Sequence, residues 1–225
     1  MVKVSGLAMM LIVLIISGCG NSEKQKPQAG TKAAGDDSAN VTNTKTILFF
    51  GNSLTAGYGL DVSEAFPALI QARIDSLKLP YKVVNAGLSG ETSAGGKNRI
   101  GWLLRQKVDV FVLELGANDG LRGIPVKETV KNLQDIIDSV KTKNPETKMI
   151  MTGMQVPPNM GSTYSTEFRN IFAELAKKNN MALVPFVLEG VGGIPELNQG
   201  DGIHPTAPGH RVVAENVWQI LKPML

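Results

Sequence analysis

The stretch "ILFFGNSLTAGYG", residues 47–59, joins an unbroken apolar run (47–50) to a loop that contains three glycines. An apolar run without alternation is typical of a strand that is buried on both faces, as the strands of a parallel sheet are. Further apolar runs occur at 83–84, 110–115 and 149–154. Helical patterns separate these runs, so the sequence predicts strands that alternate with helices.

The amphipathic segments each place their apolar residues on one helical face. The first face consists of Phe66, Leu69, Ile70, Ile74 and Leu77, the second of Val130, Leu133, Ile137 and Val140, the third of Phe168, Ile171, Phe172 and Leu175, and the last of Val213, Val217, Ile220 and Leu221. This order predicts a three-layer α/β/α sandwich with right-handed crossovers, built on a flavodoxin-like parallel sheet of about five strands.

The composition is that of a globular protein, because 43% of the 225 residues are hydrophobic and 19% are charged. The formal net charge of +3 is small and scattered along the chain, which argues against a nucleic-acid partner. Residues 46–225 are enough for one domain with a hydrophobic core, and we expect that domain to be a monomer.

The chain begins with an apolar run, 4–16, that is shorter than the roughly 20 residues a helix needs to span a bilayer. Residues 1–18 therefore read as a secretory signal peptide. The motif "ISGC", which ends at Cys19, resembles the lipobox of bacterial lipoproteins, and this resemblance implies cleavage before Cys19 and lipidation of its thiol. Residues 19–45 contain hardly any large apolar side chain and are predicted to be a flexible tether. Together these segments predict an exported, membrane-anchored lipoprotein of the bacterial cell envelope.

Four polar loops are expected to meet at one edge of the sheet, because the carboxyl ends of parallel strands share an edge where ligands bind. Three of them follow the first three strands, at 51–59, 85–96 and 115–120, and the fourth, 201–210, precedes the last helix.

These loops contain the side chains that acyl transfer needs. Ser53 lies just after the first strand in a glycine-flanked turn, where its hydroxyl would be accessible as a nucleophile. His204 is the candidate base that removes the hydroxyl proton. Asp201 is close enough in sequence to accept the other ring N–H of that histidine. His210 is expected to have a packing or capping role.

Negative charge that develops on a substrate oxygen needs donors that are already in place. The backbone N–H groups of Ser53 and Gly90 and the side-chain amide of Asn118 are the three candidates for such an oxyanion hole. Taken one at a time, "GNS", "SGETS" and "GANDG" are equally compatible with ordinary turns or helix starts.

The combination resembles the SGNH (GDSL) hydrolase superfamily over residues 46–225. "GNSL" (51–54) is similar to the block that carries the nucleophile, and "DGIHP" (201–205) to the block of the triad acid and base. Gly90 and Asn118 match the glycine and asparagine of the two intervening blocks. The stretches "ELGANDGLRG" (114–123) and "DGIHP" look especially like the bacterial thioesterase I, lysophospholipase and arylesterase branch. This resemblance implies hydrolysis of acyl esters and thioesters without a cofactor.

One position departs from that superfamily, because Asn52 stands where an aspartate is usual. Asparagine keeps a carbonyl acceptor and loses a charge. Other catalytic motifs are absent: 51–57 lacks the Lys-Ser/Thr of a P-loop, and Thr55 breaks the α/β-hydrolase elbow. With one cysteine and two histidines, no metal site is expected.

The substrate is less well defined by the sequence. The resemblance implies that the loop 155–164 helps to form the acyl site, with Val156, Pro157 and Met160 as candidate contacts. An exported enzyme does not meet intracellular acyl-CoA, which favours lysophospholipid or a small ester. Two alternatives stay open at this stage: a carbohydrate O-acetyl esterase with a polar, shallow cleft, and a lipid-anchored binding protein without turnover.

Overall fold

The computed structural model of the protein describes residues 44–225. The predicted signal peptide, Cys19 and all but the end of the predicted tether lie outside the described residues. Within the described part of the chain, no helix is both long and apolar enough to cross a membrane.

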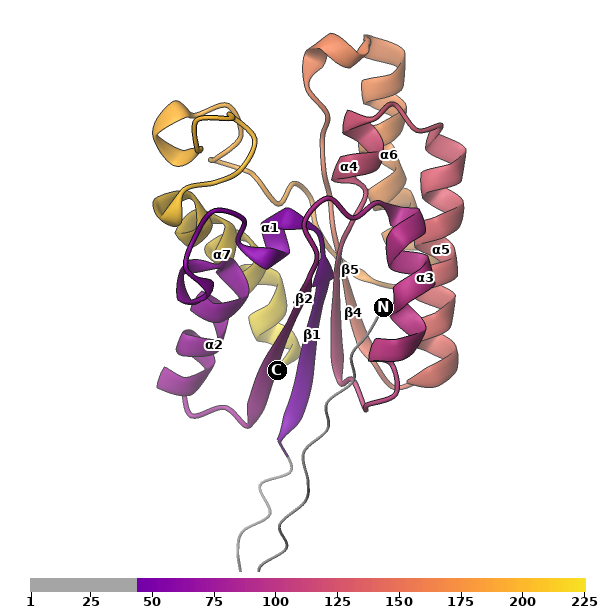
Figure 1. Ribbon diagram of the computed structural model, residues 1–225. Helices are drawn as coiled ribbons and strands as arrows, with labels where there is room; N and C mark the ends of the chain where they lie inside the picture. The colour runs from indigo at the N-terminus through magenta and orange to yellow at the C-terminus, as the bar shows by residue number, and fades with distance from the viewer. Residues whose placement is uncertain (1–43) are drawn as a thin grey trace, which may run out of the picture. The chain divides into compact units, whose positions relative to one another are not determined.

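Five parallel strands form one sheet in the order β2-β1-β3-β4-β5, which confirms the flavodoxin-like prediction (Figure 1). The strands are β1 (Lys45–Gly51), β2 (Tyr81–Gly87), β3 (Val110–Glu114), β4 (Lys148–Thr152) and β5 (Ala182–Val184). β2 is longer than its apolar core of 83–84, because it is an edge strand and tolerates polar side chains such as that of Asn85. β5 has only three residues and was not among the predicted runs.

Helices cover both faces of the sheet (Figure 1). On one face lie α2 (Phe66–Ser76) and α7 (Ala207–Leu221), and on the other α3 (Ser93–Leu103), α5 (Val126–Lys143) and α6 (Ser162–Asn179). Short helical turns occur in the connections: α1 (Ser53–Ala56), η1 (Val62–Glu64), α4 (Ala117–Leu121), η2 (Pro158–Met160), η3 (Pro195–Leu197) and η4 (Lys222–Met224). Leu77, which was expected on the same helical face as Phe66, is the residue just past the end of α2 and is half exposed.

The apolar run of β1 packs against both helical layers. Phe49 meets Phe66 of α2 edge to face, with ring centroids 5.5 Å apart. The next residue, Phe50, points to the opposite face, where the guanidinium of Arg99 on α3 stacks 4.4 Å from its ring centroid. Because successive residues of a strand face opposite sides, burial of both faces requires the unbroken run that the sequence shows.

The two ends of the described chain lie at the edge where the strands begin. Lys45 starts β1 and donates its backbone N–H to the carbonyl of Pro80, which immediately precedes β2. At the other end, the hydroxyl of Tyr81 donates to a main-chain oxygen of Leu225 at 3.0 Å. The loops that follow the strands therefore occupy the opposite edge, away from both ends.

Candidate active site

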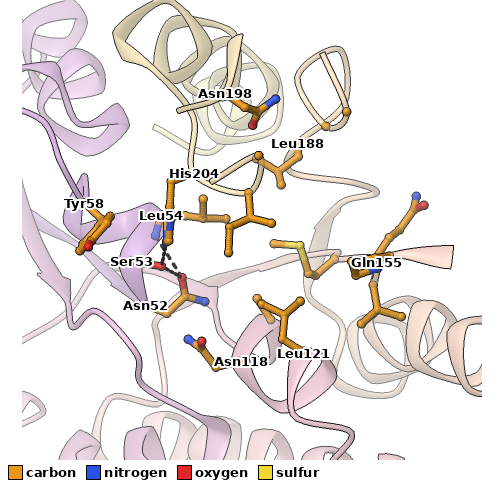
Figure 2. A pocket seen from close by; sticks show the side chains of 18 of the residues that line it. Asn52, Ser53, Leu54, Tyr58, Asn118, Leu121, Gln155, Leu188, Asn198 and His204 are labelled. Atoms are coloured by element: carbon orange, nitrogen blue, oxygen red, sulfur yellow. Dashed lines mark hydrogen bonds between the residues drawn. The ribbon is translucent and has the colours of Figure 1, made fainter. Parts of the chain in front are cut away.

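A cavity of about 540 Å³ opens at the carboxyl edge of the sheet (Figure 2). Its lining comes from the loops after all five strands and from the loop before α7. The order of the strands reverses between β1 and β3, which is where ligands bind in sheets of this kind. Ser53, Gly90, Asn118 and His204 all line the cavity, although they are scattered along the chain.

Ser53, His204 and Asp201 form a continuous chain of hydrogen bonds (Figure 2 shows the contact between the first two). Nε2 of His204 lies 2.9 Å from the hydroxyl oxygen of Ser53, and Nδ1 lies 2.6 Å from Oδ2 of Asp201. The hydrogen bond with His204, together with the backbone N–H groups of Ile203 and His204, lowers the pKa of Asp201 to about 2. An ionised Asp201 keeps the ring proton on Nδ1, which leaves Nε2 free to accept the hydroxyl proton.

The turn that carries Ser53 is a helix start. β1 ends at Gly51, and Asn52 caps α1 by accepting the N–H of Leu54 on its side-chain oxygen at 3.0 Å. Ser53 is the first residue of α1, so its backbone N–H has no intrahelical partner. Among the described residues, nothing accepts a hydrogen bond from that N–H.

Two further donors belong to residues that line the same cavity, Gly90 and Asn118. Gly90 has a φ of +80°, a backbone conformation that favours glycine, and its N–H also makes no hydrogen bond within residues 44–225. One hydrogen of the Asn118 amide binds the carbonyl of Glu91, with 3.0 Å between nitrogen and oxygen. The other hydrogen makes no hydrogen bond within the described residues, and Asn118 lines the same cavity as Asn52 and Ser53 (Figure 2). The three groups expected to form an oxyanion hole are thus brought to one place.

A buried carboxylate lies beneath the turn that carries Ser53. Glu114, at the end of β3, accepts from the backbone N–H of Asn52 (3.2 Å) and from its side-chain amide (2.9 Å). It also accepts from the N–H of Thr55 (3.3 Å) and from the hydroxyl of that residue (2.8 Å). Burial raises the pKa of Glu114 to about 7, although these hydrogen bonds oppose the shift. Sequence reasoning missed this residue, whose only signal was a charge at the end of the apolar run 110–115.

His210 lies outside this arrangement. Its ring is buried, and Nδ1 accepts the backbone N–H of Phe66 at 3.1 Å. Burial, with a smaller contribution from the charge of His204, lowers the pKa of His210 to about 4. It is therefore a neutral packing residue, in keeping with the expectation from the sequence.

The walls of the cavity are mostly apolar. Val156 and Pro157 line it as expected, but Met160 does not, because it lies beyond them in the turn η2 and packs against the core. Leu188 and Leu121 stand on opposite sides of the cavity in Figure 2. The lining residues that sequence reasoning missed also include Leu54, Tyr58, Met154, Phe186 and Ile203.

No lysine, arginine, aspartate or glutamate is among the residues that line the cavity. The described part of the chain also holds no group of three or more histidine, cysteine or acidic side chains arranged to bind a metal ion. The cavity therefore suits an uncharged, apolar group placed next to the hydroxyl of Ser53.

Comparison with known proteins gives consistent matches. Residues 49–212 match the sequence model of the GDSL-like lipase/acylhydrolase family. Esterase TesA of Pseudomonas aeruginosa is 42% identical over 182 residues, which are 80% of this chain and 90% of that protein. Thioesterase 1/protease 1/lysophospholipase L1 of Escherichia coli is 38% identical over 181 residues, 80% of this chain and 85% of that protein. A crystal structure of TesA has a TM-score of 0.77 at 42% identity and covers 80% of this chain and 100% of its own.

Proposed function

The chain belongs to the GDSL-like lipase/acylhydrolase family, and we propose that it is a serine esterase that hydrolyses acyl esters through an acyl-enzyme on Ser53. The observation that carries this proposal is the chain of contacts from Ser53 through His204 to Asp201, at 2.9 Å and 2.6 Å, at the wall of an apolar cavity. These distances lie within hydrogen-bond reach of a nucleophile and its base.

The reaction has two symmetrical halves. Nε2 of His204 takes the proton of Ser53 while the hydroxyl oxygen attacks the ester carbonyl, and the resulting imidazolium returns the proton to the departing alcohol. A water molecule then takes the place of the alcohol. His204 removes a proton from this water while the water oxygen attacks the acyl group on Ser53. The imidazolium returns the proton to the oxygen of Ser53 as the carboxylic acid leaves. Asp201 stays ionised throughout and stabilises the imidazolium, which the low pKa of this carboxyl supports.

In both halves the carbonyl oxygen becomes negatively charged. The backbone N–H groups of Ser53 and Gly90 and the free amide hydrogen of Asn118 are its donors in this proposal. Ser53, Gly90 and Asn118 all line the cavity, the two backbone N–H groups have no acceptor within the described residues, and the Asn118 amide uses one of its two hydrogens for the carbonyl of Glu91. Fixed donors stabilise the charged state without a cost of reorganisation during the reaction.

The acyl part of the substrate occupies the apolar cavity. The candidate substrates are lysophospholipid, aryl esters and short-to-medium acyl esters, and thioesters by the same chemistry. The names of the similar proteins, an esterase and a thioesterase/lysophospholipase, support this class. The mostly apolar lining, which contains no charged Lys, Arg, Asp or Glu side chain, supports binding of an apolar acyl chain in this cavity.

The alternatives are less well supported. A carbohydrate O-acetyl esterase would need a polar, shallow cleft, whereas most of the surface that lines this cavity is apolar and includes the side chains of Leu54, Leu121, Met154 and Leu188. A binding protein without turnover would have no need for a base hydrogen-bonded to a nucleophile.

The export and anchoring of the enzyme belong to the same proposal. They rest on the apolar run 4–16 and on the lipobox-like "ISGC" that ends at Cys19. More than one acyl chain on that cysteine would make anchoring stable, where a single chain is marginal.

The experiment that tests the function is a panel of p-nitrophenyl esters from acetyl to palmitoyl, assayed beside a lysophospholipid and an acetylated sugar. We expect kcat/KM to rise with chain length while the acyl group fills the cavity, and the acetylated sugar to be the poorest substrate. A preference for the acetylated sugar would favour the carbohydrate esterase instead.

A further inference from the structure

Asp201 and His204 lie on a tight hairpin. Its two arms are joined by an isolated antiparallel bridge between Asn198 and Pro205. The backbone N–H of Gln199 donates to the carbonyl of His204 at 2.7 Å, and the carbonyl of Gln199 accepts the N–H of Gly202 at 2.9 Å. The position of the base therefore depends on where this hairpin is held.

The side chain of Gln199 connects the hairpin to the loop of the nucleophile. Its Nε2 donates to the carbonyl of Tyr58 at 2.7 Å and to the carbonyl of Pro205, next to His204, at 3.0 Å. Tyr58 in turn donates its backbone N–H to the carbonyl of Ser53 at 3.0 Å. A short path of hydrogen bonds thus leads from Ser53 to His204, which are separated by 151 positions in the sequence.

The loop that contains Tyr58 and Gly59 packs closely against the side chain of Gln199. Gly59 has a φ of +78°, and a Cβ built there would collide with the side-chain oxygen of Gln199. The ring of Tyr58 lies against the ring of His204, with centroids 4.6 Å apart. The loop thus meets the hairpin through both its backbone and an aromatic ring.

The neighbouring amide fixes the other side of the hairpin. Nδ2 of Asn198 donates to the carbonyls of Val191 and Ile194, at 2.7 Å and 2.8 Å. The segment that it holds includes Gly192 and Gly193, which line the cavity. Two adjacent amides therefore join the hairpin to the cavity wall on one side and to the nucleophile loop on the other.

We propose that Gln199 is a positioning residue that sets the distance between the hydroxyl of Ser53 and the base His204. The inference rests on the proposed serine esterase function. Gln199 is not among the residues that line the cavity, so it acts through His204 and not on the substrate. Misplacement of a catalytic group by about 1 Å can cost on the order of 10²-fold in rate.

The test uses Gln199→Met, which keeps the length of the side chain and removes the donor, together with Gln199→Ala. We expect kcat to fall about 10- to 100-fold in both variants, with KM within about twofold of the wild-type value. Gln71→Ala is the matched control, since Gln71 also bridges backbone groups, those of Tyr81 and Val83, but does not line the cavity or contact the hairpin. That control should retain full kcat.

A second background separates positioning from a general structural effect. When His204 is already replaced by alanine, adding Gln199→Met should lower the residual rate by less than about twofold, because effects that act through one residue are not additive. The inference would be overturned if Gln199→Met lowered the rate of His204→Ala by the same factor as it lowers the rate of the wild type. It would also be overturned if the single Gln199 variants had a raised KM and a normal kcat.

Failure of this inference is distinct from failure of the proposed function. If Gln199→Met has wild-type kcat while Ser53→Ala and His204→Ala are inactive, the esterase function stands and Gln199 has no positioning role. If Ser53→Ala keeps its activity, the proposed function itself is wrong. Thermal unfolding midpoints of all variants show whether each one is folded at the assay temperature.

Discussion

The side-chain amide of Asn52 donates to the buried carboxylate of Glu114 at 2.9 Å, directly beneath the nucleophile turn. At position 52, where the related hydrolases usually have aspartate, this chain therefore has a donor facing an acceptor. An aspartate at this position could hydrogen-bond to Glu114 only if one of the two carboxyl groups were protonated and acted as the donor. With asparagine at position 52, Glu114 has an amide donor as its neighbour instead of a second carboxyl group. The hydrogen bond between the two side chains therefore does not require a proton shared between two carboxyl groups.

This relationship predicts the effect of Asn52→Asp. Two carboxyl groups in one buried site raise the pKa of the pair, so the variant should lose stability as the pH rises above about 7 and ionisation of both groups is forced. We expect the midpoint of urea unfolding to fall more steeply than in the wild type between pH 7 and 9. The double variant Asn52→Asp/Glu114→Gln reverses donor and acceptor and should remove that extra slope. Identical slopes in the single variant and the wild type would contradict the argument.

The second prediction concerns two buried groups with opposite effects on stability. The folded-state pKa of His210 is lowered to about 4, so the unfolded chain takes up the proton first and stability is lost as the pH falls below 6.5. The pKa of Glu114 is raised to about 7 from 4.5, so its contribution is lost as the pH rises through that range. With about 1.4 kcal/mol per pKa unit, each pKa shift corresponds to roughly 3 kcal/mol in the free energy of unfolding. Between about pH 5 and 6.5 the effects of His210 and Glu114 on this free energy have opposite signs and nearly cancel.

His210→Gln, which retains an acceptor for the N–H of Phe66, should therefore expose the effect of Glu114 alone. We expect the free energy of unfolding of this variant to increase as the pH is lowered from 7 to 5, while that of the wild type changes little. Urea titrations at four pH values measure this directly. A wild-type slope in His210→Gln would mean that the histidine is not held neutral by the fold.

The third prediction tests the nucleophile. An organophosphonate should label the protein once, at Ser53, because this hydroxyl is the one hydrogen-bonded to His204. Ser89 is the matched control, since it lines the same cavity and lies next to Gly90. Mass spectrometry should find full labelling in Ser89→Ala and none in Ser53→Ala. Labelling of any other residue would reassign the nucleophile.

The fourth prediction concerns the oxyanion donor Asn118. A donor that binds an oxygen only when it becomes charged contributes to the transition state and not to the bound substrate. We therefore expect Asn118→Ala to lower kcat on the order of 10²–10³-fold with little change in KM. The same substitution also removes the hydrogen bond to the carbonyl of Glu91, so the thermal midpoint is measured in parallel. A raised KM at normal kcat would make Asn118 a substrate-binding residue.

The fifth prediction concerns the anchor. Cys19→Ala should release the mature domain from membranes and leave the esterase activity of the soluble fraction unchanged, because the described domain begins well after this cysteine. Fractionation of cells that express each form, followed by an activity assay of both fractions, measures the effect. Continued sedimentation of Cys19→Ala with membranes would refute the lipoprotein proposal.

The parts of the site that the sequence predicted are those whose signal is local. Ser53 follows an apolar run within a few residues, and Asp201 and His204 stand three positions apart, so short motifs are enough to identify them. Glu114 and Gln199 were missed because their partners lie 62 and 141 positions away, and such pairings depend on the folded chain.

The misses in the fold have similar causes. β5 has three residues, which is too short for a periodic pattern to stand out. Leu77 continues the apolar period of α2 past the residue at which the helix ends, so the pattern did not show that the side chain would be half exposed. The spacing of apolar residues predicts which residues share one face of a helix. The residue at which the helix ends depends instead on local caps and on neighbouring segments.

Because both ends of the described chain lie at the edge where the strands begin, the cavity opens on the side of the domain away from them. A fusion partner or a solid support attached through either end would leave the cavity unobstructed, which makes the domain well suited to oriented immobilisation. The same geometry bears on the proposed anchoring. If the domain is held to a bilayer through the proposed tether, the tether would join the domain at the edge opposite the cavity, so the attachment itself would not block the entry of substrate.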